Sequence, residues 1–199
     1  MSAEPERTRL RDELLLATLP HVAFEGWTDR ALRAGNAACG VSAAEAELAF
    51  PGGAAEMIAH WSAWSDERML AALAAVDLAA MSESDRLALA MRSRLETNVS
   101  YREAVRRTLA YLALPMRAGL GARLTWRTAD AIAYAAGETA TDFSFYTRRA
   151  LVAGIYAATV LVWLDDDSEA FVETSAFLDR RIADLSRLPQ PAALLARLR

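Results

Sequence analysis

Residues 137–164 constrain the fold of this chain more than any other segment. A polar stretch leads to two adjacent arginines, Arg148 and Arg149, and the fifteen residues that follow, 150–164, carry no charge. Such a run is typical of a helix that is buried along most of its length, with its cationic end near a surface or the mouth of a cavity. Cationic groups at the edge of an apolar interior indicate the binding of an amphiphilic molecule.

The remainder of the chain also has a helical pattern. Hydrophobic residues make up 54% of the sequence, and they recur three and four positions apart rather than at every second position. Hairpin turns of the Asn-Gly or Asp-Gly type do not occur in the sequence, so antiparallel strands are not indicated. The chain has 199 residues and only six prolines, which is sufficient for a sizeable core. We therefore predict an all-α fold.

Caps and helix breakers predict where the helices begin and end. Ser42 and Glu45 have the spacing of a capping box, and Pro51 stops the short helix that this box opens. Gly119 and Gly121 are positions where a helix could be interrupted. The other predicted helices cover residues 8–24, 28–38, 54–80, 84–98, 101–114, 115–136, 142–164 and 169–188, with a turn at 165–168.

We predict a single all-helical domain, 1–199, with three parts. Residues 7–53 form a helix-turn-helix-like unit, 54–188 a larger ligand-binding bundle, and 189–199 a short tail. No linker is long or polar enough to separate independent domains. The tail mixes leucines and arginines, which suits an anionic membrane surface, with a frayed terminus as the alternative.

Composition and motifs argue against catalysis. The two histidines, His21 and His60, have no carboxylates at Glu-x-x-His spacing, and Cys39 has no second cysteine with which to form a disulfide or a metal site. The chain has no glycine-rich phosphate loop and no nucleophile elbow. We expect no enzyme activity, no metal and no cofactor other than a bound lipid.

Charge and hydropathy bear on the location of the protein. The amino terminus has no apolar signal-peptide core, and the uncharged run 150–164 is shorter than the roughly 20 residues that cross a bilayer. We expect a cytoplasmic protein that touches a membrane without spanning it. The net charge of −4 provides no electrostatic footprint for nucleic acid.

The first fifty-three residues resemble the amino-terminal unit of TetR-type repressors, in which the third helix reads the DNA major groove. In this chain the corresponding stretch, 42–49, contains Glu45 and Glu47 and has neither a cation nor an aromatic residue. These carboxylates would be repelled by DNA phosphates. We expect a structural unit without DNA binding, and keep a ligand-sensing TetR-type regulator as the alternative.

Further motifs extend the resemblance along the chain. Most of residues 8–185 resemble the TetR-fold lipid-binding accessory proteins of ubiquinone (coenzyme Q) biosynthesis. The matching motifs are Gly26-Trp27-Thr28, Phe50-Pro51-Gly52-Gly53, Asp130-Ala131-Ile132, Thr141-Asp142-Phe143, Tyr146-Thr147-Arg148-Arg149, Tyr156, Asp165 to Ser168, and Phe177-Leu178-Asp179-Arg180-Arg181-Ile182. The family often has tryptophan where Ala133 and Phe145 stand in this chain.

This resemblance implies a specific function. Members of the family are not known as catalysts. They bind isoprenoid quinone intermediates or other lipids in an internal pocket, and present them to the di-iron demethoxyubiquinone hydroxylase. The resemblance also implies a homodimer and peripheral association with the inner membrane through a carboxy-terminal helix. A scaffold for the hydroxylase that transfers no lipid is a further alternative.

Two groups of residues are the candidate sites. The predicted lipid-binding residues are Arg149, Val152, Ile155, Tyr156 and Val160, and the predicted partner surface is Asp142, Phe145 and Tyr146. On a helix, Arg149 shares a face with residues one turn before and after it, so its guanidinium could hold a lipid phosphate or a quinone oxygen.

Each candidate also has a structural explanation. Arg149 could instead form a salt bridge with Asp142 or Asp130, and Asp142 could simply cap its helix. Phe145 and Tyr146 could belong to the core. The tryptophans at core-compatible helical spacing are taken as packing residues, and they are Trp61, Trp64, Trp126 and Trp163.

Overall fold

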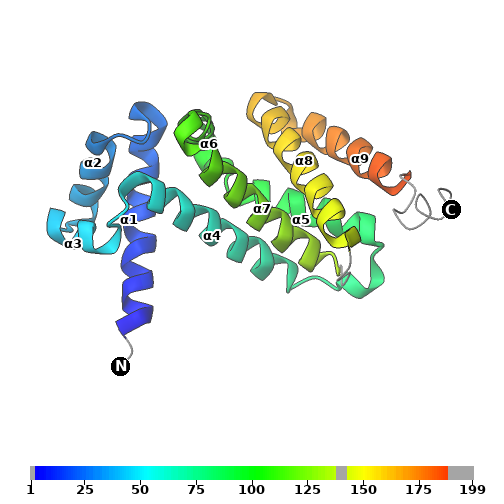
Figure 1. Ribbon diagram of the computed structural model, residues 1–199, viewed down its shortest axis with the longest axis horizontal. Helices are drawn as coiled ribbons and strands as arrows, with labels where there is room; N and C mark the ends of the chain where they lie inside the picture. Colours follow the sequence, from blue (N-terminus) through cyan, green and yellow to red (C-terminus); the bar gives the residue numbers. More distant parts are fainter. Residues whose placement is uncertain (1–2, 138–142, 188–199) are drawn as a thin grey trace. The chain divides into compact units, whose positions relative to one another are not determined.

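The computed structural model describes residues 3–137 and 143–187, and every regular element in these two ranges is helical, as predicted. The α-helices, labelled in Figure 1, are α1 (Ala3–Glu25), α2 (Asp29–Cys39), α3 (Ala43–Ala49), α4 (Gly53–Leu73), α5 (Glu83–Glu96), α6 (Arg102–Leu112), α7 (Ala118–Ala135), α8 (Phe143–Asp165) and α9 (Val172–Arg187). Single 3₁₀ turns are η1 (Leu78–Ala80), η2 (Val99–Tyr101), η3 (Pro115–Arg117) and η4 (Glu169–Phe171).

The chain divides into two compact units. Unit 1 comprises Met1–Ser65 and Asn98–Leu124, and unit 2 comprises Asp66–Thr97 and Thr125–Arg199. Helices α4 and α7 each contribute residues to both units. The predicted single domain, with divisions after residues 53 and 188, stays a prediction.

Unit 1 begins with the three helices expected of a helix-turn-helix. The hydroxyl of Thr28 caps α2 by accepting a hydrogen bond from the Ala31 amide at 3.3 Å, and Gly40 ends the helix with a left-handed φ of 68°. Helices α1 and α2 approach closely at Gly35, where an added Cβ would lie 2.8 Å from the Thr18 Cα. A side chain at position 35 would therefore push the two helices apart.

The capping box predicted for α3 is present. The Glu45 amide donates to the Ser42 hydroxyl at 3.3 Å, and the Ser42 amide donates to a Glu45 carboxylate oxygen at 3.0 Å. The Ser42 hydroxyl also donates to this carboxylate at 2.6 Å, and this hydrogen bond together with the one from the Ser42 amide lowers the pKa of Glu45 below its ordinary value. Both ends of the box satisfy backbone groups that the start of a helix leaves without partners.

The core of unit 1 is aromatic at its centre. The rings of Trp27 and Trp61 lie 6.3 Å apart, and Tyr101 meets Trp61 edge to face at 6.3 Å. The indole Nε1 of Trp27 donates to the Thr108 hydroxyl at 2.7 Å, so α6 provides the polar partner that a buried indole needs. The prediction that Trp61 serves as a packing residue is confirmed, because it is buried, and Trp27 is buried in the same core.

Unit 2 combines an aliphatic core with a buried charged group. Met69, Met91 and Ile132 are fully or almost fully buried within this core. Beside them, Asp66 accepts hydrogen bonds from Arg94 Nε at 2.8 Å and from the Thr128 hydroxyl at 2.9 Å, and all three of these side chains are buried. We refer to Asp66, Arg94 and Thr128 as the buried polar cluster. The sequence pattern did not predict it.

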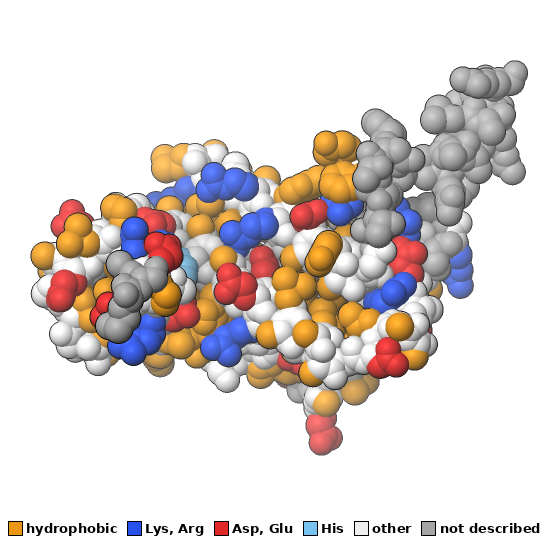
Figure 2. Space-filling view, turned by 90° about the horizontal axis from the view of Figure 1, so that it is seen from below, with side chains coloured by type: hydrophobic (Ala, Val, Ile, Leu, Met, Phe, Trp, Pro, Cys, Tyr) orange, Lys and Arg blue, Asp and Glu red, His pale blue; other side chains and the backbone are white. Residues whose placement is uncertain are grey.

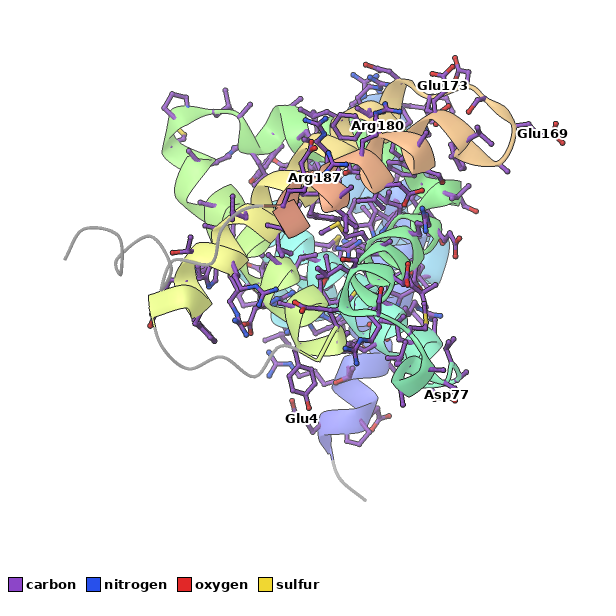
Figure 3. The ribbon with its side chains drawn as sticks, turned by 90° about the vertical axis from the view of Figure 1, so that its right-hand side faces the viewer. Glu4, Asp77, Glu169, Glu173, Arg180 and Arg187 are labelled. Carbon is purple, nitrogen blue, oxygen red and sulfur yellow. The ribbon has the colours of Figure 1, made fainter. Side chains whose placement is uncertain are left out.

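The carboxy-terminal part of α8 leads into a compact turn. Asp166 is buried and accepts hydrogen bonds from the amide and hydroxyl groups of Ser168 and Thr174. Burial alone would raise the pKa of Asp166, but these hydrogen bonds outweigh it and hold the pKa well below its usual value. The turn predicted at 165–168 is present, with Asp165 and Asp167 exposed as expected of a solvated turn and helix cap, whereas Asp166 is buried. Glu173 and Arg180 of α9 are exposed, as Figure 3 shows.

Two predicted boundaries are wrong. Helix α4 ends at Leu73 rather than near residue 80, because tight turns follow and the Asp77 carboxylate caps η1 by accepting from the Ala79 amide at 3.2 Å. Helix α7 runs without a break through both of its glycines. A Cβ at Gly121 would make only an ordinary contact, 3.5 Å from the Leu112 Cβ, so neither a break in the helix nor close packing requires a glycine there.

Candidate functional site

One face of α8 carries most of the predicted lipid-binding residues. Val152 and Val160 are buried, and Ile155 and Tyr156 are partly buried. Val152 belongs to the core of unit 2, and Ile155 and Tyr156 pack against that core. The structure therefore places these four residues on the inner side of α8, where an apolar ligand would have to lie among them.

Tyr156 brings a polar group to this inner face. Burial raises the pKa of its hydroxyl, with Arg94 opposing the shift and Asp66 adding to it. Both of these charges belong to the buried polar cluster. An apolar helix face and a buried polar group thus occur together in unit 2.

Arg149 lies below the surface rather than at an open mouth. Its side chain is almost completely buried, with the residue 4% exposed. The Nε atom donates to Asp130 Oδ1 at 2.5 Å, and the guanidinium carbon lies 3.4 Å from the centre of the Phe145 ring. The salt bridge to Asp130 that was considered for this residue is present. A contact between Arg149 and a lipid head group stays a prediction.

An exposed aromatic group covers this arginine. Tyr146 is 63% exposed, and its ring lies 5.0 Å from Phe145 and 6.4 Å from Trp126, stacked on the latter at 24°. We refer to Trp126, Phe145 and Tyr146 as the aromatic surface. The prediction that Trp126 is a packing residue is wrong, because this tryptophan is exposed. Helical spacing alone did not show which side of α7 would face solvent.

Three other residues of the family motifs or departures from them, Asp142, Arg148 and Ala133, contribute nothing described to the aromatic surface. Asp142 lies outside the described residues. Arg148 is partly buried and forms an ion pair with Glu83 of α5. Ala133, where the family often has tryptophan, is completely buried and adds nothing to the aromatic surface.

The outward face of α8 is apolar and exposed. Its exposed residues, three or four positions apart, are Tyr146, Ala150, Gly154, Ala157 and Leu161. The segment Phe145–Asp165 is long and apolar enough to cross a membrane by length and composition, and one third of its most apolar window is buried. The expectation that this helix is buried along most of its length is therefore wrong. Figure 2 shows that hydrophobic side chains also lie between charged ones elsewhere on the surface.

The surface of α3 has the opposite character. Glu45, Glu47 and Leu48 are exposed on this helix, and Leu48 is 77% exposed. A cavity of about 380 Å³ lies between α2, α3 and the start of α4, and its charged lining residues are Asp29, Arg33 and Glu47. The position that reads DNA in a helix-turn-helix thus presents carboxylates.

Two further titratable side chains, His60 and Cys39, each have a polar partner on α1. His60 Nε2 lies 2.7 Å from Asp12 Oδ1, and the Cys39 thiol donates to the Glu13 carbonyl at 3.4 Å. Burial raises the pKa of Cys39, and the charge of Glu13 adds to the shift. In residues 3–137 and 143–187, no three His, Cys, Asp or Glu side chains are grouped to hold a metal ion.

Named relatives cover most of this chain. The chain is 32% identical to the ubiquinone biosynthesis protein COQ9, mitochondrial, of Rattus norvegicus over 191 residues, which are 92% of this chain and 61% of the relative. It is 31% identical to the protein of the same name from Homo sapiens, over 92% of this chain and 60% of the relative. The chain therefore spans about three fifths of the length of these curated relatives.

A solved structure supports the fold. The crystal structure of the TetR transcriptional regulator from Nitrosomonas europaea matches with a TM-score of 0.75, covering 90% of this chain and 99% of that one at 22% identity. At this identity the likeness concerns the fold alone, and it confirms the predicted TetR-like, all-α architecture.

The family match covers the helices that carry the aromatic surface. Residues 118–189 match the COQ9 family model, and this range contains α7, α8 and α9. The resemblance predicted from the sequence is thus confirmed, and residues 118–189 carry a COQ9-family domain.

Proposed function

We propose that this chain is a non-catalytic, lipid-binding accessory protein of ubiquinone biosynthesis. It binds isoprenoid quinone intermediates or phospholipid and presents them to the demethoxyubiquinone hydroxylase. The names of the relatives from Rattus norvegicus and Homo sapiens support a place in ubiquinone biosynthesis. The observation that carries the proposal is the aromatic surface at the start of the apolar helix α8.

The aromatic surface suits a protein partner. Exposed tyrosine and tryptophan side chains are enriched at binding hot spots because they bury a large area with little loss of side-chain entropy. The buried guanidinium of Arg149 packs against the Phe145 ring of this surface, and its hydrogen bond to Asp130 fixes its position. The partner in this proposal is the hydroxylase, and Tyr146 is its main contact.

The inner face of α8 suits an isoprenoid chain. Val152 and Ile155 provide apolar contacts, and Tyr156 lies where a quinone oxygen could accept a hydrogen bond. An apolar wall with a few polar groups is the usual composition of a small-molecule site. Binding requires α8 to move relative to the helices that pack against it, since this face is buried in the core of unit 2.

Lipid extraction tests the first part of the proposal. Protein purified without detergent should release a quinone intermediate or a phospholipid that mass spectrometry identifies. The Arg149→Ala variant should retain less lipid with helicity unchanged. Arg148→Ala is the matched control, since the neighbouring arginine pairs with Glu83 instead. Wild-type protein that yields no lipid would contradict the proposal, and unfolding of Arg149→Ala would assign this arginine to structure alone.

Co-purification tests the second part. The Tyr146→Ala variant should lose the hydroxylase, because it removes the most exposed ring of the aromatic surface. Tyr134→Ala is the control, since Tyr134 is 74% exposed on α7 but has no ring contact with that surface among the described residues. Equal recovery of the hydroxylase with both variants would exclude Tyr146 as the contact.

The remaining parts of the proposal concern assembly and location. The chain forms a homodimer through its carboxy-terminal helices and associates peripherally with the inner membrane. Either contact would cover the exposed apolar face of α8, which supports these two parts of the proposal. The relatives are named as mitochondrial proteins. Light scattering at several protein concentrations measures the assembly, and a monomer at all of them would remove the dimer from the proposal.

A further inference from the structure

The turn between α6 and α7 exposes an apolar tip in unit 1. Met116 in η3 is 87% exposed, and Leu114 beside it is also exposed. Ala113, Pro115 and Ala118 complete the tip, and each of them is exposed as well. In Figure 3 this turn, in light green at the upper left, carries side chains that point away from the ribbon. These five exposed apolar residues lie within six positions of the chain. A contiguous exposed apolar patch of this kind marks a surface that binds a protein or a membrane.

Positive charge predominates around the tip, and the nearest carboxylate in the sequence is that of Glu103 at the start of α6, which pairs with Arg106 at 3.3 Å and with Arg107 at 3.1 Å. Residues 104–124 contain no aspartate or glutamate, although the chain has a net charge of −4. The arginines of this segment are Arg106, Arg107, Arg117 and Arg123. Arg117 lies over the Tyr111 ring at 3.5 Å, which holds its guanidinium next to the tip.

Helical spacing places these arginines on the exposed sides of both helices. On α6, Arg106, Arg107 and Ala110 are exposed, and so is Ala113, the residue that ends this helix. On α7, Arg123 is exposed one to two turns after the tip. The tip is therefore an apolar end with cationic side chains on the helix that enters it and on the helix that leaves it.

We propose that the α6–α7 turn inserts into the surface of an anionic lipid bilayer. Apolar side chains flanked by arginine are the composition that binds membrane interfaces, because the apolar part enters the head-group region while the guanidinium groups contact lipid phosphates. The residues of the tip belong to unit 1, and none of them is among the residues predicted to bind lipid on α8 of unit 2. Insertion of the turn does not depend on the function proposed for those residues.

The large exposed apolar residue of α3 lacks this charge pattern. Leu48 on α3 is exposed to a similar degree as Met116, but Glu45 and Glu47 lie on the same helix. Carboxylates beside an apolar residue oppose binding to anionic lipid. Leu48 is therefore the matched control for Met116.

Vesicle partitioning of the full chain tests the proposal. Wild-type protein should bind vesicles of phosphatidylcholine with phosphatidylglycerol more tightly than vesicles of phosphatidylcholine alone. Met116→Asp should weaken binding to the anionic vesicles about tenfold, since it removes one large inserted side chain. Arg123→Gln should weaken it about fivefold and reduce the preference for anionic lipid. Leu48→Asp should bind like the wild type, because that surface is not inserted.

A fluorescent label tests insertion directly. In a Cys39→Ala background, an environment-sensitive dye on Met116→Cys should shift to the blue with anionic vesicles, while the same dye on Leu48→Cys should not. All variants keep the tail, so binding through the tail alone would leave Met116→Asp unchanged and overturn the proposal. Loss of the hydroxylase by Met116→Asp, with vesicle binding intact, would make the turn a protein contact and overturn it equally.

Discussion

The two units stabilise their interiors in different ways. Unit 1 packs Trp27, Trp61 and Tyr101 together and needs one neutral hydrogen bond, from Trp27 to Thr108. Unit 2 buries the charged pair of Asp66 and Arg94 instead. A buried neutral group that loses its hydrogen-bond partner costs about 1–3 kcal/mol, whereas breaking a buried ion pair costs about 3–5 kcal/mol. We expect unit 2 to tolerate single changes at its centre less well than unit 1.

The largest expected effect is at the buried pair. Asp66→Ala should lower the free energy of unfolding by about 3–5 kcal/mol, because it leaves Arg94 charged and buried without its carboxylate. Chemical denaturation followed by circular dichroism measures the change. The double variant Asp66→Leu with Arg94→Met should recover most of the loss. If the double variant is as unstable as the single one, the charge pair is not the cause.

The next effect tests packing in unit 1. Gly35→Ala should cost about 1–3 kcal/mol, because the new Cβ would lie 2.8 Å from the Thr18 backbone and α1 and α2 would have to separate. Gly154→Ala in unit 2 is the control, since nothing lies within 4 Å of a Cβ there. That variant should be neutral or stabilising by up to about 1 kcal/mol. Thermal melts of both variants provide the comparison.

A smaller effect is expected at the hydrogen bond of unit 1. Thr108→Val keeps the shape of the side chain but leaves the Trp27 indole without its acceptor, which should cost about 1–2 kcal/mol. This is the counterpart of Asp66→Ala in the other unit. A loss at Thr108 equal to or larger than that at Asp66 would reverse the contrast between the two units.

The smallest effect depends on pH. The pKa of Asp166 is lower in the folded than in the unfolded chain, so its contribution is complete above the unfolded pKa of about 4 and is lost as the pH falls below that value. Asp166→Asn should cost about 0.5–2 kcal/mol at neutral pH. The difference from the wild type should shrink in denaturation experiments at acidic pH. A difference independent of pH would mean that the charge does not matter.

Local signals predicted local structure well. The capping box of Ser42 and Glu45 and the all-helical fold follow from short-range spacing, and both are confirmed. The early end of α4 was missed because helix propensity continues past Leu73 while tight turns and the cap at Asp77 stop the helix.

Contacts between distant residues could not be predicted in this way. Asp66 meets Arg94 and Thr128 across 28 and 62 positions, and no periodic pattern marks such a pair. The same limit applies to the candidate site. Sequence spacing placed Arg149 near Phe145 and Tyr146, but not the stack of Trp126 on Tyr146, which requires α7 and α8 to be packed together.

Helix α4 has a consequence for how the protein unfolds. Within this one helix, Trp61 belongs to the core of unit 1 and Met69 to the core of unit 2. A helix of this kind is stabilised mainly by the packing of its sides, so melting one unit removes the support from half of α4 and weakens the other half. Hydrogen exchange along α4 should therefore report a shared opening of both units rather than two independent ones.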